Sequence, residues 1–66
     1  MTLKEYEEYL LDNTKNGMLS SLDTRLFDTA YKAVNIQELD FVIENTGSLM
    51  VQDYASKKKI IWLAKK

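Results

Sequence analysis

Apolar residues recur at helical spacing along most of the chain, and this pattern predicts three helices before residue 48. The first helix begins at about Leu3, with Leu3, Tyr6 and Leu10 on one face. The other apolar positions that follow this spacing are Tyr9 and Leu11 in the first helix, Leu22, Leu26, Phe27, Ala30, Tyr31, Ala33 and Val34 in the second, and Ile36, Leu39, Val42 and Ile43 in the third. Phe41 points away from the apolar stripe of the third helix.

Start and stop signals stand at the ends of these segments. Thr2 and Glu5 have the spacing of a capping box, in which each side chain binds the backbone amide of the other residue. Gly17 offers a left-handed stop for the first helix. The second helix is expected to begin between residues 20 and 24, where several residues favour the N-cap. Asn35 is a plausible N-cap for the third helix, which is expected to end near residues 45–47.

The last third of the sequence allows two interpretations. In the first, Ser48 caps a helix that runs toward the end of the chain. The apolar residues of such a helix do not share one face, since Leu49, Ile60 and Leu63 fall opposite Met50, Val51, Tyr54, Ala55, Ile61 and Trp62. This helix is therefore expected to be buried on two sides or interrupted. In the second, residues 41–44 and 49–52 form a β-hairpin around residues 45–47.

Composition favours the helical interpretation. The chain has 66 residues, no proline and two glycines, and 45% of its residues are hydrophobic. Such a chain is long enough for one small core, and the lack of helix breakers favours helices over turn-rich β structure. We therefore predict one all-α domain over residues 1–66, a bundle of three to four short helices. The alternative is an α+β domain with a short hairpin within residues 41–52.

The side chains that carry most protein chemistry are missing. The sequence contains no cysteine and no histidine, which excludes disulfides, thiol nucleophiles and imidazole bases or ligands. It also has no glycine-rich phosphate loop. Glu5, Glu8 and Asp12 share one helical face, but this spacing is more typical of a solvated acidic face than of a Mg²⁺ or Ca²⁺ site. We expect no enzymatic activity, no catalytic residues, no bound metal and no cofactor.

Charge divides the sequence into an acidic body and a basic end. Residues 1–54 hold all ten acidic residues and four basic ones, whereas residues 55–66 hold five lysines and no acid. Lys57, Lys58 and Lys59, with Trp62 beside them, are candidate contacts for nucleic acid or another anion. Lysines near the end of a helix also stabilise the helix without any partner. The same lysines could instead lie against the acidic first helix.

Tyrosine content points to a protein partner. Tyrosine is enriched at protein interfaces, and four tyrosines exceed what so small a core can bury. We therefore expect contacts through Tyr6, Tyr9 and Phe41 with the flanking acids Glu5 and Glu8. The predicted function is that of a small non-enzymatic protein-binding regulator or accessory factor, for which a homodimer is one expected state. The alternative is a nucleic-acid-binding protein acting through residues 57–66.

The predicted location is the cytoplasm. The first residues lack the basic and long apolar segments of a signal peptide. The longest uninterrupted apolar run, residues 60–64, is far too short to span a bilayer.

Overall fold

A computed structural model describes residues 2–65, and the ordered elements in this range are all helices. The four helices are α1 (Leu3–Lys15), α2 (Ser21–Tyr31), α3 (Ile36–Asn45) and α4 (Leu49–Ala64). The prediction of an all-α bundle is thus confirmed. The hairpin alternative is wrong, because residues 41–44 belong to α3 and residues 49–52 form the first turn of α4. This last helix is also continuous, so the interruption, one of the two alternatives for it, does not occur.

Each helix begins at a side chain that accepts a hydrogen bond from the first turn. The Thr2 hydroxyl accepts from the Glu5 amide at 3.2 Å, and the Glu5 carboxylate accepts from the Thr2 amide at 3.1 Å, which completes the predicted capping box. Ser20, Asn35 and Ser48 cap α2, α3 and α4 in a similar way. Gly17 follows α1 with a φ of 70°, a left-handed conformation that favours glycine.

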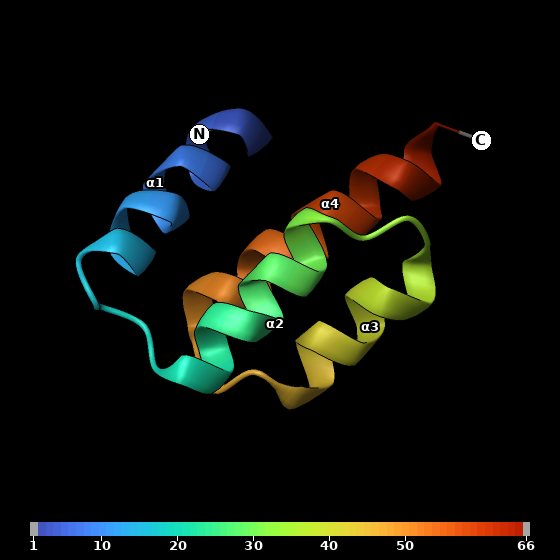
Figure 1. Ribbon diagram of the computed structural model, residues 1–66. Coiled ribbons are helices and arrows are strands. Elements are labelled where there is room, and N and C mark those ends of the chain that lie inside the picture. The colour runs from blue at the N-terminus through green and yellow to red at the C-terminus, as the bar shows by residue number, and fades with distance from the viewer. Residues whose placement is uncertain (1, 66) are drawn as a thin grey trace.

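The two central helices are α2 and α4, with α1 on one side and α3 on the other (Figure 1). Helix α4 contacts each of the other three helices, whereas α1 and α3 do not contact one another within the described residues. The central helices α2 and α4 each contact both α1 and α3, which do not reach one another. These contacts explain the buried residues on the inner side of α4, which are Val51, Tyr54, Ala55 and Lys58.

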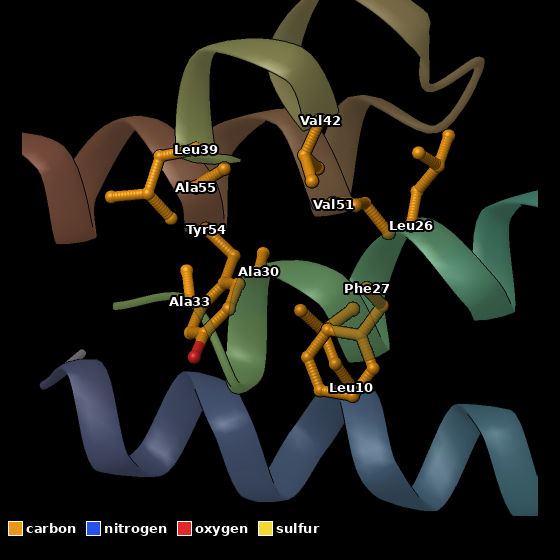
Figure 2. Packing of buried hydrophobic residues seen from close by; sticks show 10 residues of the cluster. All are labelled: Leu10, Leu26, Phe27, Ala30, Ala33, Leu39, Val42, Val51, Tyr54 and Ala55. Carbon is orange, nitrogen blue, oxygen red and sulfur yellow. The ribbon is translucent and has the colours of Figure 1, made fainter. Parts of the chain in front are cut away.

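The core lies between α2 and α4 and extends to α1 and α3 (Figure 2). Its buried members are Leu10, Leu26, Phe27, Ala30, Ala33, Leu39, Val42, Val51, Tyr54 and Ala55. Tyr54 is the largest of the fully buried side chains, and its ring lies 5.4 Å from that of Phe27 and 6.1 Å from that of Tyr6. Its hydroxyl is directed toward α1, where it donates to the Glu7 carboxylate at 2.8 Å. One side chain thus links α1, α2 and α4.

A polar junction around Asp23 joins the start of α2 to the loop between α3 and α4. Its Oδ1 atom accepts from the Thr46 hydroxyl at 2.8 Å and from the Gly47 amide at 3.0 Å. The Ser20 hydroxyl donates to the other carboxylate oxygen at 3.0 Å. These donors, the Thr46 hydroxyl foremost, lower the pKa of Asp23. The junction therefore holds the α3–α4 turn against α2 through an ionised carboxylate.

Candidate protein-interaction surface

The aromatic residues expected to contact a partner do not form one surface. Tyr6 is half-buried and packs against Tyr54, and burial, followed by the neighbouring Asp53 carboxylate, raises the pKa of its hydroxyl. Tyr9 is exposed on α1, and Phe41 is exposed on α3. Because α1 and α3 do not contact one another, a patch that combines Tyr6, Tyr9 and Phe41 does not exist within the described residues. Phe41 is therefore separate from the two tyrosines of α1, which are three residues apart on one helix.

The two acids expected beside that patch have different surroundings. Glu5 belongs to the capping box, and its hydrogen bonds with Thr2 lower the pKa of the Glu5 carboxyl group. Glu8 is exposed on α1. Helix stability thus accounts for Glu5 without a partner, and Glu8 stays a candidate contact on an exposed face.

Lys58 is buried, which contradicts its expected place on a basic surface. The residue is 8% exposed, and its ammonium group donates to the backbone carbonyls of Ala30 at 2.8 Å and Tyr31 at 2.9 Å. The same group lies 5.4 Å from the ring centre of Trp62 and 5.9 Å from that of Tyr54. Burial lowers the pKa of Lys58. The Lys58 side chain is therefore part of the interior, where carbonyl dipoles and aromatic rings stabilise its charge.

The neighbouring lysines point away from Lys58 and from each other. Lys57 is exposed and lies 3.8 Å from the Asp53 carboxylate on the same helix. Lys59 lies on the α3 side, where its ammonium group donates to Asp40 at 2.6 Å. Trp62 is half-buried and packs against the core. The four residues proposed as a nucleic-acid contact therefore do not form a continuous basic surface with an exposed ring.

Helix α4 has a second apolar face that the other helices leave uncovered. Its inner face buries Val51, Tyr54, Ala55 and Lys58. On the opposite face, Leu49 is 81% exposed, Ile60 is 65% exposed and Leu63 is 47% exposed. The expectation that this helix is buried on two sides is thus wrong for the protein as a single chain. Ile60 and Leu63 lie one turn apart, and adjoining exposed apolar side chains are typical of interaction sites. Leu49 lies apart from them at the start of the helix.

A groove adjoins this outer face where the end of α4 passes the start of α1. It has a volume of about 500 Å³ and is lined by Thr2, Leu3, Lys57, Ile60 and Ile61. Ile60 belongs to both the groove and the outer face, so the two features are continuous. The sequence signal for this surface was the apolar residues on the far side of α4. Spacing alone does not reveal how many neighbours a helix has, so this signal predicts either burial on two sides or an interruption.

Comparison with known proteins finds no matching family model, no similar curated protein and no similar solved structure. Over residues 2–65, no helix is both long and apolar enough to cross a membrane. In the same part of the chain, no group of three or more acidic side chains has an arrangement that could hold a metal ion.

Proposed function

We propose that this protein is a small non-enzymatic regulator or accessory factor that binds another protein through the outer face of α4 and the adjoining groove. The observation that carries the proposal is the exposure of Ile60 and Leu63 on consecutive turns beside an apolar groove. Removing apolar surface from water is worth about 25 cal/mol per Å², so a partner that covers these side chains gains binding energy.

Polar residues border this apolar face, as they do in many protein interfaces. Asp53 and Lys57 lie along one edge, and Lys59 lies along the other beside Asp40. In such an interface, burial of the apolar centre contributes most of the binding energy. The charged rim contributes specificity, because it favours partners with complementary charge. The acidic body of the chain adds to this selection.

The alternative function, nucleic-acid binding through residues 57–66, has less support. Phosphate contacts require lysines that reach the solvent together. Lys58 is engaged with two carbonyls in the interior, and Lys59 is paired with Asp40. Only Lys57 and the lysines at the end of the chain are left for that role, and Lys57 itself lies close to Asp53.

A pull-down from lysate tests the proposal. The bait is the tagged protein, compared with the variant that carries both Ile60→Glu and Leu63→Glu, each with and without nuclease treatment. A matched control is Leu22→Glu, since Leu22 is 59% exposed but lies on α2. We expect the wild type and the control to retain a protein partner after nuclease treatment and the double variant to lose it. Retention by all three baits would refute the proposed surface, and loss of the partner with nuclease alone would favour nucleic-acid binding.

A further inference from the structure

The polar links between helices divide the structure into two unequal parts. Asp23 in α2 accepts two hydrogen bonds from the loop between α3 and α4. Lys58 in α4 donates to two carbonyls at the end of α2, and Lys59 in α4 is paired with Asp40 in α3. These contacts tie α2, α3 and α4 into a three-helix unit, and none of them involves α1.

Helix α1 is attached to the three-helix unit by polar groups at one place within residues 2–65. Tyr54 of α4 donates to the Glu7 carboxylate at 2.8 Å. The Tyr6 hydroxyl, one residue earlier in α1, lies beside the carboxylate of Asp53, one residue earlier in α4. Both approaches join the same turn of α1 to the same turn of α4. Apolar packing holds the remainder of α1.

The core is divided just as unequally. Nine of its ten buried residues lie within residues 26–55, which belong to the three-helix unit. Helix α1 has 13 residues and contributes the tenth, Leu10, whereas the 11 residues of α2 contribute three. The three-helix unit therefore keeps most of the core without α1. Segments with few buried contacts open at a lower free energy than the rest of a protein.

The connection between α1 and α2 has the features of a hinge. Residues 16–20 are exposed except for Leu19, which is partly buried. Gly17 has a φ of 70°, and a side chain at this position would meet no atom within 4 Å. Hinges are a few loop residues that absorb changes in φ and ψ while the helices on either side move as rigid bodies.

Opening of α1 would dismantle the groove beside α4. One wall of the groove is formed by Thr2 and Leu3 at the start of α1, and the other is formed by Lys57, Ile60 and Ile61 of α4. The start of α1 lies at the opposite end of the helix from the connection to α2 (Figure 1). A rotation about that connection therefore displaces this wall more than any other part of α1.

We propose that α1 is a movable helix that opens as a unit about residues 16–20, and that its closed position completes the groove. This inference rests on the proposed function, since it names the regulation of the same surface. A partner that contacts both walls binds only the closed form. Its apparent affinity is then set by the fraction of chains in which α1 is docked.

Amide hydrogen exchange of the purified protein, measured by NMR at several urea concentrations, tests the opening. We expect the most protected amides of α1 to exchange at least about tenfold faster than those of α2 and α4. They should share one urea dependence that is weaker than that of α2 and α4, because undocking one helix exposes less surface than global unfolding. Equal rates and urea dependences in all helices, or fraying of α1 without urea dependence, would overturn the inference.

The substitution Thr46→Val separates opening of α1 from global unfolding. It removes a donor to Asp23 inside the three-helix unit, and this junction stays intact when α1 opens. We expect faster exchange of the most protected amides in α2 and α4 and unchanged exchange in α1. Equal acceleration in α1 would show that α1 opens only with the whole chain.

A variant with α1 undocked tests the link to binding. Leu10→Asp places a charge at the fully buried position of α1 and leaves Ile60 and Leu63 unchanged. We expect its α1 amides to lose protection, those of α2 and α4 to keep it, and the pull-down to retain less partner than the wild type. Loss of protection throughout the chain would contradict an independent three-helix unit. Full retention of the partner with α1 unprotected would contradict control of the groove by α1.

The inference and the proposed function fail in different ways. If α1 exchanges together with the other helices but the double variant Ile60→Glu and Leu63→Glu loses the partner, the proposed function stands and the inference is wrong. If α1 opens separately but the double variant keeps the partner, the proposed surface is wrong and so is its regulation by α1.

Discussion

The ammonium group of Lys58, in the second half of α4, lies 2.8 Å from the carbonyl oxygen of Ala30 in α2. The last carbonyls of a helix have no partner within that helix and carry part of the negative end of its dipole. By donating to Ala30 and also to Tyr31, Lys58 caps α2 from another helix. The sequence predicts Lys58 as a contact for nucleic acid or another anion. In the structure its charge instead stabilises the junction of α2 and α4.

Replacing this lysine with methionine should destabilise the protein. In Lys58→Met the apolar stem is largely kept, but the carbonyls of Ala30 and Tyr31 lose a donor in the interior. An unsatisfied buried acceptor costs about 1–3 kcal/mol, and we expect a loss of that size in the free energy of unfolding measured with urea. Lys57→Met is the matched control and should change this energy by less than about 0.5 kcal/mol, because its pair with Asp53 is exposed. Equal effects of the two substitutions would contradict the capping role.

The hydroxyl of Tyr54 should contribute separately from its ring. Tyr54→Phe keeps the buried ring and removes the hydrogen bond to Glu7. Hydrogen bonds to charged groups contribute about 1.5–3 kcal/mol, so we expect a decrease of that order in the free energy of unfolding. Tyr9→Phe, at an exposed position of α1, is the control and should be close to neutral. A neutral Tyr54→Phe would show that the link from α4 to α1 depends on packing alone.

The Asp23 junction should make the free energy of unfolding depend on pH in the acid range. Because hydrogen bonds in the folded protein lower the pKa of Asp23, the unfolded chain binds the proton more readily than the folded one. The stabilisation is fully present above the unfolded pKa of about 3.9, and it is lost as the pH falls through the lower folded pKa. The free energy of unfolding of the wild type should fall between neutral and acid pH. We expect a smaller fall in Asp23→Asn, as measured by urea unfolding at a series of pH values.

Asp28→Asn is the control for this series, since Asp28 forms only an exposed pair with Lys32 on the same helix. This substitution should leave the acid dependence close to that of the wild type. If both variants change the profile equally, the junction with Thr46 and Gly47 is not the source of the effect.

The outer face of α4 should be dispensable for folding. In dilute solution, Ile60→Glu and Leu63→Glu should each change the free energy of unfolding by less than about 0.5 kcal/mol, because both side chains are exposed in the single chain. Leu39→Ala, in the buried core, should cost about 2–5 kcal/mol by comparison. Circular dichroism during thermal unfolding measures both effects. A large loss in the two glutamate variants at low protein concentration would mean that this face stabilises the monomer.

Local physical rules predicted the helical segments before residue 41, but they left residues 41–52 open between helix and hairpin. The spacing of Leu3, Tyr6 and Leu10 predicts α1, and the caps at Thr2 and Asn35 are observed as predicted. These features depend on residues three or four positions apart, whose interactions are the same in any fold. For the same reason the absence of cysteine and histidine, and the division of charge along the chain, could be read without a structure.

Only the tertiary structure decided which faces are inside and which are outside. Lys58 is buried because the end of α2, 28 residues earlier, presents carbonyls to it, and Tyr54 is held by Glu7, 47 residues earlier. Phe41 and Tyr9 are separated because two other helices lie between α3 and α1. The apolar residues on both sides of α4 were visible in the sequence. Which side is covered depends on the number and position of neighbouring helices, and helical spacing carries no information on either.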